Sequence, residues 1–367
     1  MSALKALEIC VRKAENYFVI LRRKQYWTKL MSDNYSSLAK LQSNPQNGGG
    51  NFSTSQIKSI KSVFHNVPKF SLIFHRFYTL ATGTFCENYI PDSIYYSYID
   101  PYFNNWEMAK HIDHKGLYRN MFPGAKQPQM LAYRMNGFWY DENGEMTDKR
   151  QVIDLLTVSK PCFMKQATDS EGGHGITFID PKNHTANEIG ELLEQNKHDI
   201  VIQEGLIQSP TLSAINKCSV NTIRLISLLK RDGSVKIYSV VLRMGIGESK
   251  VDNASSGGIT VGVDNNGRLK PIAYNAKGER FDKHPTSNVK FDEFVIPNYE
   301  QVKQTILKQA KNFPHFRLVS WDIALDQDNK PVIIEANLKY GEIDFHQLNN
   351  GPLFGEDTSE ILAEVFA

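Results

Sequence analysis

The clearest alternation of hydrophobic and polar positions lies near the C-terminus, where residues 319–337 read VSWDIALDQDNKPVIIEAN. Two runs of alternating and β-branched residues flank Asp328-Asn329, and this pattern predicts a β-hairpin with a two-residue turn. One face of the hairpin is an unbroken apolar row, which must pack on a core. The row consists of Trp321, Ile323, Leu325, Val332, Ile334 and Ala336.

The polar face of this hairpin places Asp322 directly across from Glu335, and Asn337 lies two residues further along the same face. Two facing carboxylates repel each other unless a cation lies between them. Carboxylate and amide oxygens suit Mg²⁺, which proteins often hold through few ligands of their own and complete with nucleotide phosphates. The face therefore predicts a magnesium site, and the alternative is an ordinary hairpin with an exposed acidic face.

A second predicted hairpin, over residues 220–244, carries two arginines. Its centre, Asp232-Gly233, is a strong signal for a two-residue turn, and this turn places Arg224 and Arg243 on one face, diagonal to each other. Two adjacent guanidinium groups suit a triphosphate, an acyl phosphate or a carboxylate, each bound through paired hydrogen bonds. Separate salt bridges to neighbouring acids are the alternative.

A polar, glycine-rich loop follows this hairpin at residues 251–258. Loops carry substrate contacts more often than the elements that they connect. Asp252 and Asn253 are the candidate functional residues of this loop.

A lysine interrupts a short strand that otherwise reads as buried, at residues 161–166. This residue is Lys165, and a buried lysine needs an anionic partner. The segment Glu171-Gly172-Gly173-His174-Gly175 follows, ahead of a second strand at 176–179. Its three glycines let backbone N–H groups approach an anion closely, as phosphate-binding loops do. A flexible glycine hairpin is the alternative.

A capping box at Thr185 and Glu188 predicts the start of the next helix. The strand predicted after it, at 199–206, ends in two polar residues and a glycine. A strand with such an end can present hydrogen-bonding groups to the edge of an adenine, with Gln203 or Glu204 as the partner of its amino group.

The N-terminal part of the chain predicts helices. Residues 3–31 have a helical pattern with a basic surface, and such a helix can pack on its own domain, lie on an anionic membrane or dock on a partner. We expect it to pack on its own domain. Residues 42–56 are rich in Asn, Gly, Ser and Pro, which predicts a linker, and the aromatic residues between 70 and 102 are assigned to a core. The helical stripe consists of Leu4, Leu7, Val11, Ala14, Phe18, Leu21 and Tyr26.

Composition narrows the class of protein. The chain has 367 residues with 42 basic and 40 acidic side chains, so net charge favours neither nucleic acid nor a membrane. Its four cysteines lack zinc-site spacing, which argues against a metal or disulfide framework and is typical of a reducing compartment. No apolar run approaches the roughly 20 residues that span a bilayer, and no signal peptide is evident. We expect a soluble cytoplasmic protein of two or three domains.

Taken together, these motifs resemble those of ATP-grasp enzymes, and most closely those of the sugar-transfer-associated ATP-grasp family, over roughly residues 55–350. Asn-Thr-Ile-Arg together with Asp-Asn and Gly-Gly is the more specific part of the resemblance. The residues that carry it are Lys165 with 171–175, 201–204, 221–224, Asp252-Asn253 with Gly257-Gly258, Trp321-Asp322, and 335–337.

The resemblance implies an α+β ATP-grasp fold, in which two α+β subdomains clasp ATP between antiparallel sheets, with a helical N-terminal extension. It divides the chain into a helical segment and linker at 1–54, a pre-ATP-grasp region at 55–150, a small subdomain with the glycine loop and adenine hinge at 151–210, and a large subdomain with the metal site at 211–367.

The resemblance also implies ATP and Mg²⁺ as cofactors. By itself Lys115 reads as a surface residue, but in the family pattern it contacts phosphate. The metal ligands would be Asp322, Glu335 and Asn337, and the catalytic residues Arg224, Arg243, Asp252 and Asn253. The nucleotide contacts would be Lys115, Lys165, Glu171, Gly172, Gly173, His174, Gly175, Gln203, Glu204 and Leu206.

The activity that the resemblance implies is ligation of a carboxylate to an amine through an acyl phosphate. The expected product is an amide on a sugar acid or amino acid in surface-polysaccharide assembly, from small-molecule acid and amine substrates. Two alternatives remain: a kinase that phosphorylates a sugar or another small hydroxyl compound, with Asp252 as general base, and a nucleotide-binding protein without turnover.

Overall fold

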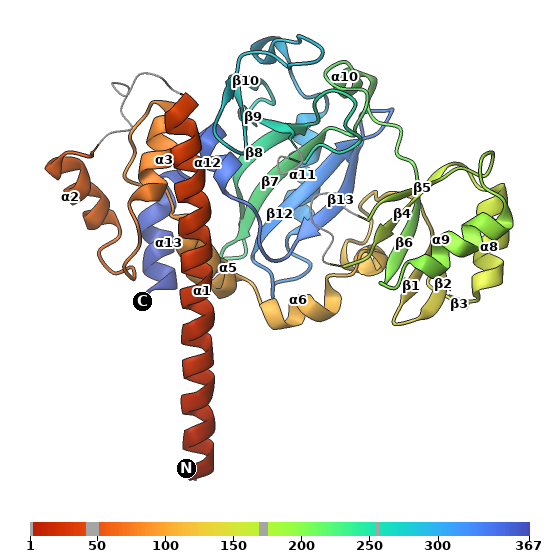
Figure 1. Cartoon of the computed structure of the whole chain (residues 1–367), viewed down its shortest axis with the longest axis horizontal. Helices are drawn as coiled ribbons and strands as arrows, with labels where there is room; N and C mark the ends of the chain where they lie inside the picture. The colour runs from red at the N-terminus through yellow and green to blue at the C-terminus, as the bar shows by residue number, and fades with distance from the viewer. Residues whose placement is uncertain (1–2, 42–50, 169–174, 254–256) are drawn as a thin grey trace.

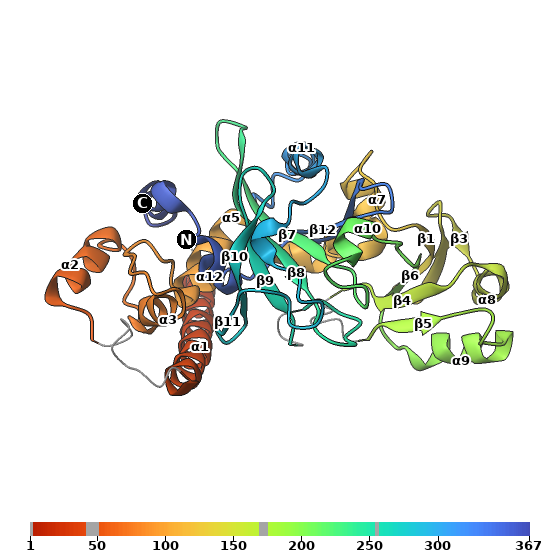
Figure 2. The same cartoon turned by 90° about the horizontal axis from the view of Figure 1, so that it is seen from above.

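The computed structural model describes residues 3–41, 51–168, 175–253 and 257–367 of the chain. Two antiparallel β-sheets lie side by side, and a group of N-terminal helices packs beyond the larger sheet, on the side away from the smaller one (Figure 1, Figure 2). The structure therefore has the predicted α+β architecture with a helical N-terminal extension.

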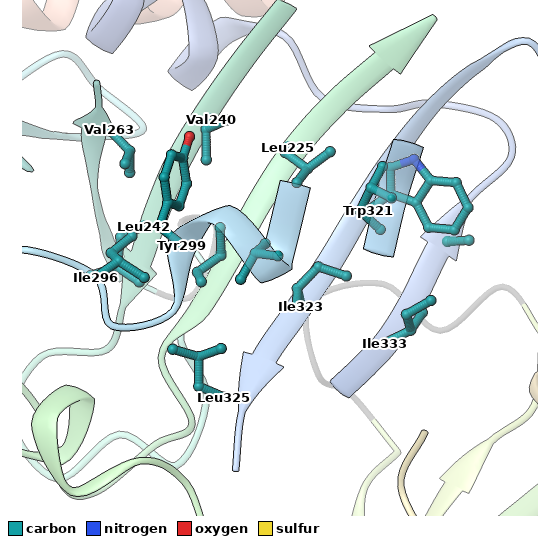
Figure 3. Packing of buried hydrophobic residues seen from close by; sticks show 14 of the residues in the cluster. Leu225, Val240, Leu242, Val263, Ile296, Tyr299, Trp321, Ile323, Leu325 and Ile333 are labelled. Carbon is teal, nitrogen blue, oxygen red and sulfur yellow. The ribbon is translucent and has the colours of Figure 1, made fainter. Parts of the chain in front are cut away.

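Within the described residues the larger sheet has seven strands, in the order β11-β10-β9-β8-β7-β12-β13, each antiparallel to its neighbours. The strands are β7 (Thr222–Leu229), β8 (Val235–Met244), β9 (Ile259–Val263), β10 (Leu269–Asn275), β11 (Arg280–Phe281), β12 (Leu318–Leu325) and β13 (Pro331–Asn337). Helix α11 (Tyr299–Gln309) covers one face, where its Val302 and Ile306 share a core with Leu225 and Trp321. Figure 3 shows Tyr299 of this helix with the core residues of the strands. This packing fixes the positions of the central strands.

The opposite face of the larger sheet is apolar at one end and polar at the other. Ile226, Leu228 and Leu318 join the core of the N-terminal helices. Helix α12 (Asp344–Asn350) packs on β8, β9 and β10. The polar end of this face carries the arginines of β7 and β8.

The smaller sheet has six strands within the described residues, in the order β3-β2-β1-β6-β4-β5. They are β1 (Met130–Met135), β2 (Phe138–Asp141), β3 (Met146–Thr147), β4 (Cys162–Gln166), β5 (Thr177–Ile179) and β6 (Ile200–Glu204). Helices α8 (Lys149–Val158) and α9 (Ala186–Gln195) share one core with the strands, through side chains such as Leu156 and Ile189. The capping box of Thr185 and Glu188 opens α9, as predicted. Strands β1–β3 bring residues 130–147 into this sheet, whereas the sequence analysis grouped them with the region before residue 151.

The β12–β13 hairpin has the predicted pairing at its polar end, where Asp322 pairs with Glu335. Its turn differs from the prediction. The backbones of Asp326 and Lys330 pair across a three-residue loop that ends at Asn329, which is left-handed with φ 60°. A bulge next to Asp322 then shifts the register by one residue. The longer turn and the bulge shift the register in opposite directions, so the residues that pair at the site are the predicted ones.

The bulge also changes which residues face the core. Ile333 packs in the core with Trp321, Ile323, Leu325 and Ala336. The predicted apolar row was therefore wrong at Ile334, which is half-buried, and at Val332, which is fully buried but pairs with Ala324 on the other face. The prediction assumed uninterrupted alternation on β13.

The β7–β8 hairpin behaves in the same way. Arg224 pairs with Val241, and Arg243 pairs with Thr222, so the arginines are diagonal on one face, as predicted. The loop again has three residues instead of two and ends at Gly233, which is left-handed with φ 82°. A bulge further along the pair restores the register.

The other helical elements lie mostly in the N-terminal third. Helix α1 runs ten residues further than predicted, and its second half packs on the domain: Trp27 stacks on Tyr96 with 3.9 Å between ring centroids, and Met31 and Leu38 are buried. In the described part of the chain, no helix is both long enough and apolar enough to cross a membrane. The elements are α1 (Ala3–Leu41), α2 (Thr54–Val63), α3 (Ile73–Thr82), α4 (Asp92–Ile94), η1 (Tyr95–Ile99), α5 (Asp100–Phe103), α6 (Trp106–Ile112), η2 (Lys115–Leu117), α7 (Tyr118–Met121), α10 (Pro210–Ser213), η4 (Phe291–Glu293), η5 (Gly355–Asp357) and α13 (Thr358–Val365).

Candidate active site

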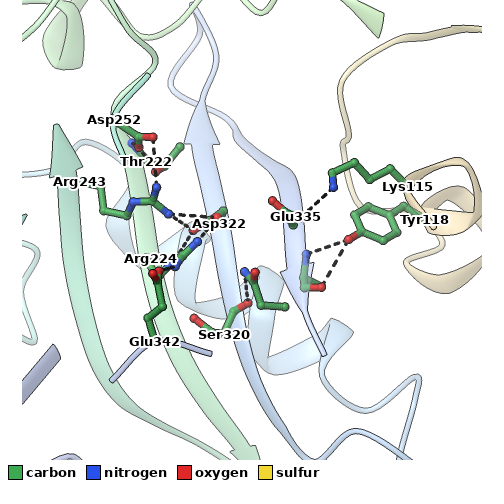
Figure 4. Close-up of polar contacts among 12 residues, drawn as sticks. Lys115, Tyr118, Thr222, Arg224, Arg243, Asp252, Ser320, Asp322, Glu335 and Glu342 are labelled. Atoms are coloured by element: carbon green, nitrogen blue, oxygen red, sulfur yellow. Dashed lines mark hydrogen bonds and ion pairs between the residues drawn. The ribbon is translucent and has the colours of Figure 1, made fainter. Parts of the chain in front are cut away.

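Charged side chains lie together beside the polar end of the larger sheet, and Figure 4 shows those of the larger sheet with Lys115. The strands of the larger sheet hold their side chains on one face, and a short helical turn brings a lysine up to them. The smaller sheet contributes a second lysine from the face that its helices leave uncovered. These residues are Lys115 of η2, Lys165 of β4, Arg224 of β7, Arg243 of β8, Asp322 of β12 and Glu335 of β13.

The Asp322 carboxylate is buried between two arginines. Arg224 donates through Nε to Oδ1 at 2.6 Å and through Nη2 to Oδ2 at 2.5 Å, while Arg243 Nη1 lies 3.3–3.4 Å from both oxygens. All three side chains are 5% exposed. Burial alone would raise the pKa of the Asp322 carboxyl, but the two arginine charges outweigh burial and hold that pKa below its usual value. Asp322 is therefore an anion at neutral pH.

Arg224 is held on three sides. Its Nη1 donates to Glu342 Oε2, in addition to the paired contact with Asp322. The guanidinium carbon lies 5.7 Å from the centre of the Phe345 ring. Burial acts to lower the pKa of Arg224, but Asp322 and Glu342 raise it, and the net shift is upward. Arg224 is thus a permanent, oriented cation.

Lys115 and Lys165 form the second basic group of the site. Lys115 Nζ lies 2.9 Å from Glu335 Oε1, and its backbone N–H donates to the Ala167 carbonyl at 3.0 Å, which ties η2 to the smaller sheet. Burial lowers the pKa of Lys165, the charge of Lys115 lowers it further, and Glu335 acts in the opposite direction. Lys115 is only 9% exposed, so the interpretation of this lysine as a surface residue was wrong.

Asp252 positions Arg243. Its carboxylate accepts hydrogen bonds from the backbone N–H of Thr222 at 3.2 Å, from the Thr222 hydroxyl, and from Arg243 Nη2 at 3.4 Å. The backbone carbonyl of Asn253 accepts from Gly258 N–H at 3.0 Å, which closes the loop. The structure thus brings Asp252 to the arginines, as the predicted site requires.

Asp322, Glu335 and Asn337 lie together on the polar face of the β12–β13 hairpin, with Asn337 paired to Ser320. Asn337 Nδ2 donates to the Ser320 carbonyl at 3.0 Å. Two carboxylates and an amide are oxygen donors of the kind that Mg²⁺ prefers, so the donor set fits this metal. Among the described residues, no three His, Cys, Asp or Glu side chains form a metal-binding group. This set would therefore need further oxygen ligands, such as phosphates.

The repulsion between the facing carboxylates is relieved by the chain itself. Arg224 and Arg243 neutralise Asp322, and Lys115 neutralises Glu335. A bound cation is therefore not the only way to make this pairing tolerable, because these three cationic side chains come from segments outside the hairpin. The magnesium assignment stays a prediction that rests on the donor set and its geometry.

The predicted adenine hinge lies at the end of β6, beside β4. Gln203 is 7% exposed, and its Oε1 accepts from Lys165 Nζ at 3.4 Å. The backbone N–H of Glu204 donates to the Gln129 carbonyl at 2.9 Å, and its carboxylate lies 3.4 Å from Lys160 Nζ. Leu206 follows, half-buried, in the segment that leaves the strand.

Only the end of the predicted phosphate loop is described. Gly175 is left-handed with φ 75°, a conformation that suits glycine. The structure describes neither Glu171, Gly172, Gly173 nor His174, so their predicted contacts with phosphate lie outside the described residues.

Three further residues support the site. The Tyr118 hydroxyl lies 3.4 Å from both the N–H and the carbonyl of Ala336, between the metal candidates of β13, and Thr222 and Glu342 hold Asp252 and Arg224. No sequence pattern marks Tyr118, whereas Thr222 stands in the Asn-Thr-Ile-Arg motif but was given no role in the predicted site. Glu342 stands in a polar segment just after the hairpin, and its closeness to the predicted metal residues is the one signal that could have found it.

Proteins of the ATP-grasp class have two antiparallel α+β units, and basic and acidic side chains gather where the units meet. This structure has that arrangement. The family model described as sugar-transfer associated ATP-grasp matches residues 95–361. The chain belongs to this family. No curated protein matches the chain.

Several solved structures resemble the chain at low sequence identity. The biotin carboxylase domain of Hydrogenobacter thermophilus 2-oxoglutarate carboxylase is 12% identical over 71% of this chain and 46% of that chain, with a TM-score of 0.42. The ATP-grasp ligase PsnB is 14% identical over 71% and 64%, with a TM-score of 0.42. The L-amino acid ligase from Bacillus licheniformis is 13% identical over 70% and 48%, with a TM-score of 0.41. This chain spans less than two-thirds of each, and the family assignment rests on the match over residues 95–361.

Proposed function

We propose that this protein is an ATP-dependent carboxylate–amine ligase that forms ADP and phosphate. The observation that carries the proposal is the meeting of four cationic side chains beside two facing carboxylates: Lys115, Lys165, Arg224 and Arg243 beside Asp322 and Glu335. Phosphoryl transfer needs such a concentration of positive charge, because the triphosphate and the transition state are strongly anionic. Membership in an ATP-grasp family supports ATP as the nucleotide.

The reaction has two steps. A substrate carboxylate oxygen attacks the γ-phosphorus of ATP, the bond to the β-phosphate oxygen breaks, and ADP leaves. The nitrogen of a neutral amine then attacks the acyl carbon, a proton is lost from that nitrogen, and inorganic phosphate leaves with the former carboxylate oxygen. The contribution of the protein to both steps is positioning and neutralisation of charge.

The two basic groups divide these tasks. Lys115 and Lys165 lie on the side of the smaller sheet and would contact the phosphates of ATP, with Gln203, Glu204 and Leu206 at the adenine and residues 171–175 over the phosphates. Arg224 and Arg243 lie on the larger sheet and would bind the acyl phosphate and the oxyanion that forms in the second step. Arginine suits this task, because its planar group makes two parallel hydrogen bonds to a phosphate or carboxylate.

Binding of substrates would exchange the partners of these cations. In the structure Lys115 contacts Glu335, and both arginines contact Asp322. Phosphate oxygens would replace the carboxylates as partners of the lysine and the arginines. Mg²⁺ held by Asp322, Glu335 and Asn337 would supply further neutralisation of the phosphate charge.

Asp252 favours the ligase over a kinase. A general base needs a lone pair directed at the substrate hydroxyl, and Asp252 has about one of its four acceptor positions left, because it accepts two hydrogen bonds from Thr222 and one from Arg243. Its proposed task is to orient Arg243, with Asn253 following it at the edge of the loop. A binding protein without turnover would have little use for two oriented arginines beside the phosphate site.

The proposed substrates are a small carboxylic acid and a small amine. A sugar acid or an amino acid in surface-polysaccharide assembly is the proposed acid, and the description of the family as sugar-transfer associated supports the link to sugars. A reaction that consumes ATP and such precursors belongs in the cytoplasm, which is the proposed location.

The test is ATP turnover with pools of carboxylic acids and amines, followed by mass analysis of the products. A condensed product together with ADP and phosphate is expected. Hydroxylamine in place of the amine should trap the acyl phosphate as a hydroxamate. A phosphorylated product that forms without an amine would overturn the ligase in favour of a kinase. If no acid led to ADP, the proposal that the protein is an enzyme would be overturned.

A matched pair of variants tests the role of the arginines. Arg243→Lys keeps the charge but loses the paired hydrogen bonds, so turnover should fall by about 10²-fold or more. Arg231→Lys is the control, because Arg231 lies in an exposed turn of the same sheet, 72% exposed, and pairs with Glu364 at the surface. Equal rates in the two variants would remove Arg243 from the proposed site.

A further inference from the structure

Helix α1 carries two apolar stripes, one on its N-terminal part and one on its C-terminal part. From Ile20 onward one side packs on the domain, through Trp27, Met31 and Leu38. Before Ile20 the apolar residues lie elsewhere on the helix. Phe18 precedes Trp27 by nine residues, which is about two and a half turns, so the two side chains point in opposite directions.

The first part of α1 extends away from the body of the protein (Figure 1). Every side chain that the structure describes between residues 11 and 19 is exposed, and Val11 and Phe18 are 48% and 63% exposed. The Tyr17 ring lies against the Phe18 ring, with 6.2 Å between centroids, and is itself 61% exposed. A helix in water seldom keeps large apolar side chains bare along one stripe, because tertiary packing supplies most helical stability.

The spacing of this stripe is that of a coiled-coil seam. Val11, Ala14, Phe18 and Leu21 follow one another at alternating intervals of three and four residues, and the sequence continues the same spacing back to Leu7 and Leu4. Six apolar positions in this strict alternation make a narrow seam, unlike the wide apolar face of a helix that lies on a membrane. The pattern stops at Leu21, where the helix reaches the domain. We propose that the seam of α1 binds the same seam of a second copy of this chain.

The charges beside the seam favour a second copy over a membrane. Glu15 and Arg22 lie seven residues apart on the same flank of the seam, so this flank carries both signs, as coiled-coil flanks do. The basic surface of the helix would attract an anionic membrane, but Glu15 at the edge of the apolar stripe would be repelled by it, and interfacial helices carry Lys and Arg at such positions.

The exposed area of the seam fits a weak, concentration-dependent contact. Tyr17 and Phe18 are 61% and 63% exposed, so the four rings of two copies can lose about two-thirds of the roughly 150–250 Å² that each ring can bury, or roughly 400–650 Å² together. Val11 and Leu21 of both copies add to this area, and the total stays below the roughly 1,200 Å² under which contacts are weak. The body of each copy lies on the opposite side of its helix from the seam, so the two bodies stay apart.

The experiment is light scattering on the full chain during size-exclusion chromatography, over a range of protein concentrations. The average mass should rise from that of the 41.8-kDa chain towards twice this value as concentration increases. A constant monomer mass at every concentration would overturn the proposal. Flotation of the monomeric chain with phosphatidylserine vesicles would overturn it in favour of a membrane contact.

Two double variants separate the seam from exposed apolar residues in general. Val11→Glu with Phe18→Glu places charges in the seam and should keep the chain monomeric at all concentrations. Val19→Glu with Tyr26→Glu is the control, because Val19 and Tyr26 are 43% and 61% exposed. Val19 lies outside the seam, and Tyr26, although part of the predicted stripe, follows Leu21 by five residues and so breaks the spacing of three and four. This control should dimerise like the unaltered chain. Dimers in both variants, or in neither, would overturn the assignment to the seam. ADP binding should be unchanged in all of these proteins, because the site lies on other elements.

Discussion

The contact between Asp322 and two buried arginines makes a prediction about the protein without any ligand. If Asp322 served only as a metal ligand opposite Glu335, its neutralisation in Asp322→Asn would relieve repulsion and stabilise the ligand-free protein. The structure predicts the reverse, because Asp322 neutralises Arg224 and Arg243, which are each 5% exposed.

The expected loss is large. Removal of one partner from a buried ion pair leaves an uncompensated charge and costs about 3–5 kcal/mol. Glu342 still pairs with Arg224 and is 41% exposed, so we expect the lower end, about 3 kcal/mol. Such a loss should lower the melting temperature by roughly 5 °C or more in a chain of this size.

Differential scanning calorimetry without nucleotide or metal measures this effect. Asp328→Asn is the matched control in the same hairpin, since Asp328 is 59% exposed and lies 3.8 Å from Lys330, a surface pair that contributes little.

The arginines hold the pKa of Asp322 below normal, so the stabilisation is present above about pH 4 and is lost as pH falls through the lowered value. The difference between Asp322→Asn and the unaltered protein should shrink in acid. An equal or higher melting temperature for Asp322→Asn near pH 7 would show that Asp322 does not stabilise the ligand-free protein.

Four further predictions concern binding and pH. Lys115→Met should weaken ADP binding about tenfold or more in calorimetry, whereas Lys110→Met on exposed α6 should not. Burial and then Lys115 lower the pKa of Lys165, so ADP affinity should decline as pH rises through that lowered pKa, and Lys165→Met should abolish the decline. Burial raises the pKa of Asp344 to about 7, so its contribution to stability is fully present below about pH 4 and is lost as pH rises to about 7, and Asp344→Asn should reduce the fall in melting temperature between those two pH values. Removal of Mg²⁺ with a chelator should weaken ADP binding at least tenfold, and a chelator-insensitive affinity would remove the metal from the site.

The pairings at the site were predicted correctly, although each hairpin has a longer loop than predicted and a bulge that was not predicted. The two differences shift the register in opposite directions. Both loops have three residues and end in a left-handed residue, Asn329 or Gly233, instead of the predicted two-residue turn. In each pair a one-residue bulge then returns the register to the predicted one before the strands reach the site. Short-range turn signals cannot reveal such a bulge, because the packing of the whole sheet decides where it forms. The error remains visible in the core, where Ile333 replaces Val332 and Ile334.

Residues that act through long-range contacts could not be predicted from the sequence. Tyr118 contacts the backbone of Ala336 from more than two hundred residues away, and Lys115 reaches Glu335 over a similar separation. Neither contact leaves a pattern in local spacing. The metal candidates could be predicted because they share one hairpin, where the periodicity of two residues fixes which side chains face together.

The balance of charge in the site explains why metal and nucleotide should bind together. Four cations, Lys115, Lys165, Arg224 and Arg243, face four carboxylates, Asp252, Asp322, Glu335 and Glu342. A divalent cation alone must compete with the arginines and Lys115 for the same carboxylates. A nucleotide alone must take those cations and leave the carboxylates unpaired in a buried place. When both arrive, the phosphates would pair with the cations, and Mg²⁺ would pair with Asp322 and Glu335. The affinity of either ligand therefore rises with the other, and linkage requires the two increases to be equal.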